Sequence, residues 1–300
     1  MTVCVGAFAA ESKAIVMVAD KAITYSSNGP ALMQWDTCVK KIIPIGPFGW
    51  RALIAGDPNF AQEVVRITVE ALTTQPDDAR SPWKVMERMK LAYQQLRETR
   101  LTDTLLIPKL LTKELLVARH KDYAPLDQNL IDDTTDEIAA FQIDCHMLVC
   151  GFDDLGDPHM FLIADPGIAQ NYDAIGFHAT GIGADVALGR LLWDEVSPKD
   201  DLEKVLYHAF EAKANAEIVS GVGYEWDAEI LISGNRVHTV PDKIKKIMDQ
   251  LFATNTAGPF GSVDDEDVAP ATWKSILKKY SVAVLAGNGD AFAPNRKKKK

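Results

Sequence analysis

Residues 3–24 read VCVGAFAAESKAIVMVADKAIT, in which two apolar runs are separated by a polar stretch at 11–13. The runs, at 3–8 and 14–19, are short and rich in strand-forming Val and Ile. Short apolar runs on either side of a polar break are typical of a β-hairpin. The sequence therefore predicts two antiparallel strands at the start of this segment.

A second hairpin is predicted at 42–45 and 50–55, because the Gly-Pro-Phe-Gly sequence at 46–49 supplies the residues that a chain reversal needs. Helices are predicted to begin at Asp57 and at Ser81. Each of these residues can cap a helix, and each is followed by proline and then by an apolar stripe at helical spacing.

The rest of the chain shows runs of strands and pairs of helices. The predicted strands lie at 141–151, 159–164, near 174–179, 227–232 and 236–239. The predicted helices follow Gly183, begin at Ser197-Pro198 and span about 242–252. Because the strands come in runs and the helices in pairs, antiparallel sheets covered by helices are expected, not alternating βαβ units.

Two segments do not fit this pattern. We interpret 100–140 as an extension of the second helix followed by a loop, which contains the acidic stretch at 132–137. Towards the C-terminus, Thr, Gly and Pro, an acidic run and a lysine tail are typical of an exposed, partly disordered extension, in which 273–284 could form a short helix. The sequence therefore predicts a domain at 1–253 and a C-terminal extension at 254–300.

The composition is that of an acidic globular protein. The 300 residues include 32 Lys and Arg against 42 Asp and Glu, a formal charge of -10, although the last five residues are all basic. A body this acidic is a poor nucleic-acid binder, because phosphate contacts need Lys and Arg on one face. No apolar run reaches the roughly 18 residues of a membrane span, so no membrane association is expected.

Location and cofactors are predicted from absent motifs. The N-terminal residues lack a basic stretch followed by an apolar core, so no secretory signal is predicted. The four cysteines include no Cys-x-x-Cys pair and are too few for a disulfide scaffold, which favours reduced thiols in a cytoplasmic protein. The nucleotide motif G-x-x-x-x-G-K-[ST] and the zinc motif H-E-x-x-H are absent, so we expect no cofactor and no metal.

Thr2 is the first candidate for chemistry. Its small side chain permits removal of Met1, after which one residue carries both a hydroxyl and a free α-amine. An α-amine titrates near ~7.7–8.0, so it can accept the hydroxyl proton at neutral pH and activate a weak nucleophile.

The residues around Thr2 strengthen this hypothesis. Asp20 ends the second apolar run, Lys41 directly precedes the strand predicted at 42–45, and Gly56 precedes the first helix. Three further motifs follow, ADPG at 164–167, ATGIGA at 179–184 and EIVSG at 217–221. This ordered set covers about residues 2–250 and resembles the proteasome β-subunits, a family of amino-terminal nucleophile hydrolases.

The resemblance implies an α+β fold, a four-layer αββα sandwich of two antiparallel sheets between helix layers. It implies that Thr2 is the nucleophile and that its own amine is the base. Lys41 would be the cation that activates and orients the hydroxyl, and Asp20 would hold that lysine charged by ion pairing. Lys41 is preferred to the neighbouring Lys40 because it directly precedes the strand.

Further roles follow from the same resemblance. The N–H of Gly56 would donate to the oxyanion of the tetrahedral intermediate. Ile54 would belong to the pocket that selects the substrate side chain before the scissile bond. Glu217 and Ser220 would buttress the amino terminus of Thr2.

The chain departs from the family pattern at two positions. Ile182 stands between two glycines where catalytic members have serine, which removes a hydroxyl near the nucleophile. Glu217 stands where the family has aspartate and is longer by one methylene. Both departures reduce the expected efficiency of peptide hydrolysis.

The implied function is a threonine-type endopeptidase that hydrolyses peptide bonds in a peptide or unfolded protein through Thr2. Self-association into a homo-oligomeric ring chamber is also implied, with a separate ATP-dependent unfoldase as a further partner. Two alternatives stay open. One is a catalytically inactive structural ring subunit that retains Met1, and the other is a non-proteolytic amide hydrolase that acts on a small molecule.

Overall fold

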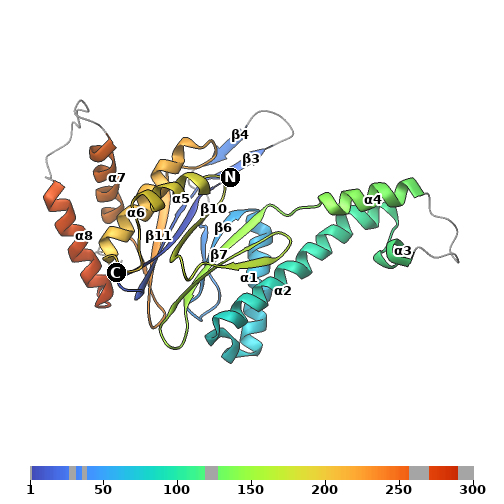
Figure 1. Cartoon of the computed structure of the whole chain (residues 1–300), viewed down its shortest axis with the longest axis horizontal. Helices are drawn as coiled ribbons and strands as arrows, with labels where there is room; N and C mark the ends of the chain where they lie inside the picture. The colour runs from blue at the N-terminus through green and yellow to red at the C-terminus, as the bar shows by residue number, and fades with distance from the viewer. Residues whose placement is uncertain (1, 27–31, 36–38, 119–127, 257–269, 290–300) are drawn as a thin grey trace, which may run out of the picture.

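The computed structural model describes residues 2–26, 32–35, 39–118, 128–256 and 270–289. In this part of the chain the strands form two five-stranded antiparallel sheets and a separate two-stranded hairpin. The strand orders of the two sheets are β10-β1-β2-β11-β12 and β5-β6-β7-β8-β9. Figure 1 shows the sheets in the body of the molecule and a helical arm that extends to one side.

The strands of each sheet come from distant parts of the sequence. The first sheet consists of β1 (Cys4–Ala9), β2 (Ala14–Asp20), β10 (Phe177–Thr180), β11 (Trp226–Ile232) and β12 (Arg236–Thr239). The second consists of β5 (Ile42–Pro44), β6 (Arg51–Gly56), β7 (Cys145–Phe152), β8 (Pro158–Ala164) and β9 (Ile168–Asn171). Both predicted hairpins are confirmed, since β1 pairs with β2 and β5 pairs with β6.

Three short strands have no counterpart among the predicted ones. They are β9 and the hairpin formed by β3 (Ile23–Ser26) and β4 (Leu32–Trp35). Each is four residues long, and β9 is largely solvent-exposed. A strand of four residues is too short to show clearly the period of two that marks a longer strand.

The first hairpin is apolar throughout because it lies between two cores. Val5 of β1 faces the core under the helices on the outer side of the first sheet, whereas Cys4 and Phe8 face the core between the sheets. The same alternation in β2 separates Val16 from Met17. Successive side chains of a strand point to opposite faces, so a strand that is buried on both faces needs an uninterrupted apolar run.

Helices cover the outer faces of both sheets. The helices α1 (Pro58–Thr74) and α2 (Pro82–Leu101) pack on the second sheet. The helices α5 (Ala184–Trp193) and α6 (Leu202–Asn215) pack on the first, and α7 (Asp242–Thr256) lies beside α6. The predicted α+β fold, with two antiparallel sheets between helix layers, is therefore confirmed.

The predicted helix starts have different outcomes. At α1 the carboxylate of Asp57 accepts hydrogen bonds from two backbone amides of the first turn, at 2.9 and 3.1 Å, and satisfies donors that a helix start leaves unpaired. The predicted start of α6 at Ser197 is wrong. The amide of Ser197 donates to the carboxylate of Asp200, and the amide of Asp200 donates back to the carbonyl of Ser197, both at 2.9 Å. These bonds close a turn, so the helix begins only at Leu202.

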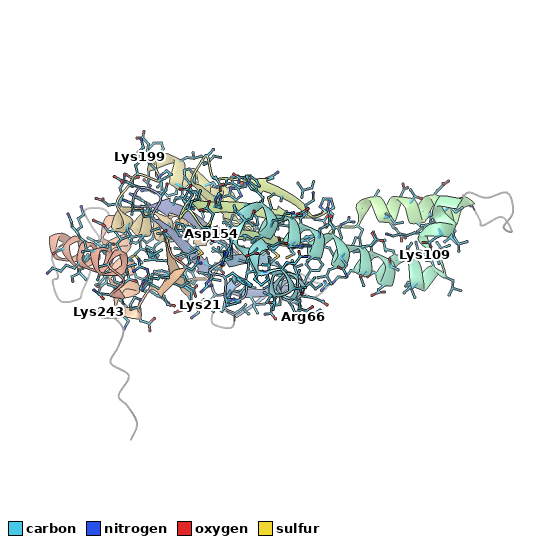
Figure 2. The ribbon with its side chains drawn as sticks, turned by 90° about the horizontal axis from the view of Figure 1, so that it is seen from below. Lys21, Arg66, Lys109, Asp154, Lys199 and Lys243 are labelled. Carbon is cyan, nitrogen blue, oxygen red and sulfur yellow. The ribbon has the colours of Figure 1, made fainter. Side chains whose placement is uncertain are left out.

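The arm is mainly helical, so the loop predicted for the acidic stretch at 132–137 is wrong. It continues from α2 through η2 (Thr102–Leu106) and η3 (Ile107–Lys109) to α3 (Lys113–Ala118) and α4 (Gln128–Ala140). Leu101, Leu106 and Leu111 form a small separate core, and Leu130 and Ile138 of α4 pack against it. These two apolar residues hold α4 in place although the residues between them are mostly polar. Figure 2 shows Lys109 far out on the arm, away from the body.

The predicted short helix at 273–284 is present as α8 (Pro270–Leu285). Trp273, Leu277, Tyr280 and Val284, at helical spacing, join the same core as α6 and α7. Residues 257–269 and 290–300 lie outside the described residues, so disorder in the extension stays a prediction. No helix among those described is long and apolar enough to cross a membrane.

Candidate active site

Thr2, Asp20 and Lys41 meet at one end of the sandwich. Thr2 lies two residues before β1 and Asp20 ends β2, so the antiparallel pairing of these strands brings the two residues to the same edge. The hydroxyl of Thr2 donates to Oδ1 of Asp20, and Nζ of Lys41 donates to Oγ1 of Thr2. Lys41 also pairs with Oδ1 of Asp20 at 2.9 Å. The structure therefore brings the proposed nucleophile, cation and carboxylate together.

The carboxylate of Asp20 is completely buried and is surrounded by donors. Besides Thr2 and Lys41, its Oδ1 accepts from the amide of Val3 at 2.9 Å. Its Oδ2 accepts from the amides of Ala22 at 3.2 Å and Gly223 at 3.1 Å. A buried charge needs such partners, since it has lost its hydration. The network fixes the orientation of Asp20 and, through it, that of Lys41.

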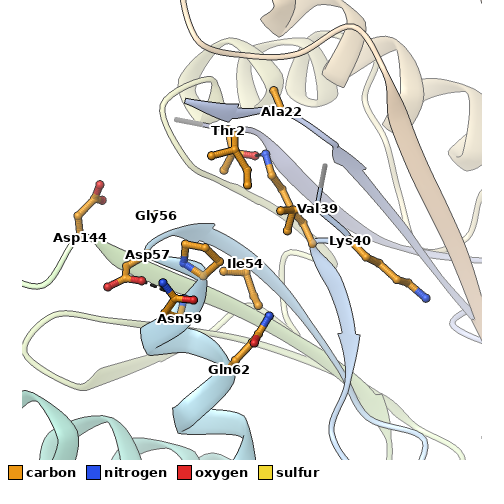
Figure 3. A pocket seen from close by; sticks show the side chains of 13 residues that line it. Thr2, Ala22, Val39, Lys40, Ile54, Gly56, Asp57, Asn59, Gln62 and Asp144 are labelled. Atoms are coloured by element: carbon orange, nitrogen blue, oxygen red, sulfur yellow. Dashed lines mark hydrogen bonds between the residues drawn. The ribbon is translucent and has the colours of Figure 1, made fainter. Parts of the chain in front are cut away.

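Lys41, and not Lys40, is the lysine that lies beside Asp20. Lys41 is 7% exposed, whereas Lys40 is 57% exposed and pairs with Glu229 at 2.7 Å. Successive side chains point to opposite sides of an extended segment, so only one of two adjacent lysines can face the site. In Figure 3 the labelled side chain of Lys40 points away from Thr2.

The backbone of Gly56 is positioned to donate into the site. The amide of Ile54 donates to the carbonyl of Lys41 and the amide of Asp57 to the carbonyl of Asp144, on the opposite side of β6. Amides alternate in direction along a strand, so the amide of Gly56 points to the side of Lys41. Gly56 has a φ of +94°, and a Cβ there would overlap the carbonyl of Asp144, so glycine is required.

A cavity of about 590 Å³ opens beside Thr2. Figure 3 shows Thr2 and Ala22 on one side and Ile54, Asn59 and Gln62 on the other. Ile54 therefore lines the cavity, at the position where the family resemblance predicts a pocket residue, and its side chain is almost fully buried. Asn59 and Gln62 belong to the first turns of α1, and sequence patterns alone did not single them out, because their positions depend on how α1 packs.

Two acidic residues also line the cavity, Asp57 and Asp144. Burial raises the pKa of Asp57, but the hydrogen bond from Arg100 and the amides of the first turn of α1 outweigh it, so this pKa lies below its usual value. Asp57 therefore stays ionised as the cap of α1. Asp144 is exposed at the rim and precedes β7.

Glu217 and Ser220 lie on the segment that follows α6. Glu217, in η4 (Ala216–Ile218), accepts from Nζ of Lys213 at 2.5 Å, and Ser220 is exposed on the next turn. Within the described part of the chain, Thr2 donates to Asp20 and accepts from Lys41 and from the amide of Gly183, and neither Glu217 nor Ser220 hydrogen-bonds to it. Their contact with a free amine on Thr2 stays a prediction.

The glycine-rich loop before α5 packs directly on Thr2. The amide of Gly183 donates to the carbonyl of Thr2 at 3.3 Å. Gly181 has a φ of +98°, and a Cβ there would overlap the same carbonyl. Ile182, between these glycines, is half exposed. The loop therefore presents an apolar side chain next to the site, where the family resemblance would place a hydroxyl.

Cys4 is a buried thiol close to the site. Its Sγ donates to the carbonyl of Ile54 at 3.4 Å, and burial raises its pKa to about 12. Cys145 and Cys150 are also buried, and their pKa values are raised by burial as well. Thiols with raised pKa values carry little thiolate and react slowly. Cys38 lies outside the described residues.

One group of described residues has the spacing of metal ligands. Ligand atoms of Asp194, His208 and Glu211 lie within 4.8 Å of one another. Arg190 contacts both carboxylates, at 2.9 Å for Asp194 and 3.1 Å for Glu211. Since this guanidinium already supplies the positive charge, the group is better explained as an ion-pair network that joins α5 to α6.

Two five-stranded antiparallel sheets in the described chain, with helices on their outer faces, are consistent with an αββα fold of the amino-terminal nucleophile type. A scan against models of known protein families found no match, and a search of the curated proteins found none either.

Proposed function

We propose that this chain is a threonine-nucleophile amide hydrolase of the proteasome β-subunit type, which cleaves peptide bonds through Thr2. The observation that carries the proposal is the buried contact of Thr2 Oγ1 with both Lys41 and Asp20, beside a cavity of about 590 Å³. In this contact the hydroxyl of Thr2 has a fixed orientation and faces a positive charge. A threonine with a purely structural role needs neither.

Removal of Met1 starts the proposed mechanism, because it frees the α-amine of Thr2. This amine accepts the proton of the Thr2 hydroxyl, either directly or through a water molecule. The ammonium of Lys41 stabilises the negative charge that develops on Oγ1. Asp20 balances the charge of Lys41, which offsets the cost of burying this ion pair.

The next step is attack of Oγ1 on the substrate carbonyl. A C–O bond forms and the carbonyl π electrons move to oxygen, where the amide of Gly56 donates to the resulting oxyanion. The protonated amine of Thr2 then delivers its proton to the leaving nitrogen as the C–N bond breaks. The products of this step are a free amine and an ester of Thr2.

Hydrolysis of the ester repeats the same chemistry with water. The amine of Thr2 takes a proton from water, and the hydroxide attacks the ester carbonyl. The C–O bond to Thr2 then breaks, and the ammonium of Thr2 returns to Oγ1 the proton that it took from water. The released acid leaves through the cavity, and the site returns to its starting state.

The cavity supports a peptide as the substrate. Its wall combines apolar Ile54 and Ala22 with the polar side chains of Asn59 and Gln62, a mixture suited to one side chain and the adjoining peptide groups. Assembly into a ring chamber, a cytoplasmic location and a separate unfoldase that delivers unfolded protein are parts of the same proposal.

An inactive ring subunit is the second candidate. Thr2 is only 2% exposed, and Ile182 replaces a hydroxyl next to it. If Met1 is retained, Thr2 has no free amine and the proposed base is missing. The intact mass of the purified protein separates the two candidates, because an active enzyme must begin at Thr2.

The decisive experiment is covalent labelling with a peptide epoxyketone directed at amino-terminal threonine, followed by peptide mapping. The proposal expects modification of the peptide that begins with Thr2 and no modification of Thr2→Ala. Thr2→Ser is the matched control, since it keeps a hydroxyl and should still be labelled. Equal labelling of Thr2→Ala and the unchanged protein would contradict the nucleophile assignment.

A further inference from the structure

A second lysine, Lys213 of α6, lies deeper in the protein than Lys41. Its side chain is completely buried. Its Nζ donates to Oε1 of Glu217 at 2.5 Å and to the backbone carbonyl of Tyr224 at 2.6 Å. Burial lowers the pKa of Lys213, and Glu217 opposes this effect. A buried ammonium is costly unless it is paired, so a lysine in this position calls for an explanation.

Through Glu217 and Tyr224, Lys213 joins η4 to the turn between η4 and β11, residues 219–225. This turn contains Gly223, whose amide donates to Oδ2 of Asp20 at 3.1 Å. The carbonyl of Glu225 accepts from the amide of Lys21, the residue after Asp20, at 2.9 Å. The bond from Lys213 to Tyr224 therefore lies between the two places where the turn contacts the end of β2.

The orientation of Asp20 depends on this turn. On Oδ2, Ala22 is a local donor two residues away, whereas Gly223 is separated from Asp20 by 203 residues. A shift of the turn would remove the long-range donor and allow the carboxylate to rotate. Since Oδ1 of the same carboxylate contacts both Lys41 and Thr2, a rotation would change the geometry at the nucleophile.

We propose that Lys213 is a positioning residue, which holds the 219–225 turn so that Gly223 fixes Asp20 in the orientation that Lys41 and Thr2 need. This inference rests on the proposed function. Lys213 does not line the cavity, so its effect is on the chemical step and not on substrate binding. The charged groups that surround it are Glu217, Asp20 and Asp249, all acidic, and they favour its ammonium form.

The test is Lys213→Met, which keeps an unbranched apolar side chain and removes both hydrogen bonds. The rate of inactivation by the peptide epoxyketone is measured over a range of concentrations. We expect the maximal inactivation rate to fall by about tenfold or more, and the half-saturating concentration to change by less than about threefold. Lys213→Gln, which keeps an N–H donor, is expected to recover part of the rate.

Lys245→Met is the matched control. Lys245 of α7 also joins a carbonyl and a carboxylate, those of Trp226 and Asp227 at 3.1 and 2.8 Å, but it does not contact the turn. Its inactivation rate should stay within about twofold of the unchanged protein, as for an independent site.

Three outcomes would overturn the inference. Lys213→Met could be inactivated as fast as the unchanged protein, or its half-saturating concentration alone could change. Both Lys213 variants could also fail to fold while Lys245→Met folds, which would assign Lys213 a purely structural role. If the unchanged protein itself is not labelled at Thr2, the proposed function fails, and this result is distinct from the other three.

Discussion

The body and the arm use apolar burial to very different extents. In the body, both faces of strands such as β1 and β2 are buried, and residues such as Leu148 contribute to a continuous core between the sheets. In the arm, the fully buried core among the described residues consists of Leu101, Leu106 and Leu111. Leu110, next to that small core, is 89% exposed.

This difference explains where chemistry can occur. A buried ion pair such as Lys41 and Asp20 needs rigid neighbours that supply hydrogen bonds and exclude water, since an unpaired buried charge is costly. The body provides such neighbours, because strands that are buried on both faces hold their ends in fixed positions. The arm can exclude little water, so we expect it to be more open to local unfolding than the body.

The largest effect is expected at the charged centre of the body. Lys41→Met leaves Asp20 buried without its cation, so activity should fall by at least about 100-fold, and the free energy of unfolding should fall by about 3 kcal/mol. Peptidase rates and urea unfolding measure the two effects. Lys40→Met, which changes the exposed neighbour, is expected to lower activity by less than about tenfold. An equal loss of activity in the two variants would contradict the assignment of Lys41 as the catalytic cation.

A cavity in the core between the sheets should have the next largest effect. Leu148 is completely buried, so Leu148→Ala should lower the free energy of unfolding by about 2–5 kcal/mol. Urea unfolding followed by tryptophan fluorescence measures the loss. Since the whole sandwich depends on this core, the body should unfold in a single transition. A separate early transition would show that the body does not unfold as one unit.

The corresponding change in the arm should act locally. Leu106 is also completely buried, but its core is small, so Leu106→Ala should lower the stability of the arm by about 2 kcal/mol and leave that of the body unchanged. Hydrogen exchange should accelerate in α4 and not in β1 or β7. Acceleration throughout the sheets would show that the arm and the body unfold together.

The smallest effect is expected at the rim of the second sheet, where His159 contacts Asp173 at 2.7 Å and Asp153 at 3.5 Å. Burial lowers the pKa of His159, but the two carboxylates outweigh it and hold this pKa above its usual value. The resulting stability is fully present below the unfolded pKa of about 6.5 and is lost as the pH rises through the folded value.

We therefore expect His159→Gln to be less stable than the unchanged protein at pH 5.5 by at most about 1 kcal/mol, with a smaller difference at pH 8.5. Thermal unfolding at the two pH values measures this. A difference that grows with pH would show that the imidazolium form is not the one stabilised by the carboxylates.

Local signals in the sequence were sufficient for the regular parts of the body. The hairpin of β1 and β2 is predicted by its uninterrupted apolar runs, because a strand buried on both faces requires them. The start of α1 is predicted by Asp57, since a side-chain cap acts within a few residues. Thr2 could be selected because its small side chain permits removal of Met1, and Asp20 and Lys41 because the ordered motifs around them resemble those of the proteasome β-subunits.

The tertiary structure decided what depends on contacts between distant residues. α4 is a helix because Leu130 and Ile138 pack on leucines that precede them by many residues, a contact that a mostly acidic stretch does not indicate. Gly223 and Lys213 carry no local signal at all, because a backbone amide and a buried lysine acquire a role only once the chain has folded. The sequence alone therefore determined which residues could form the site. The packing of the sheets determined which of them meet, because hydrogen bonds such as that of Gly223 to Asp20 join residues 203 positions apart.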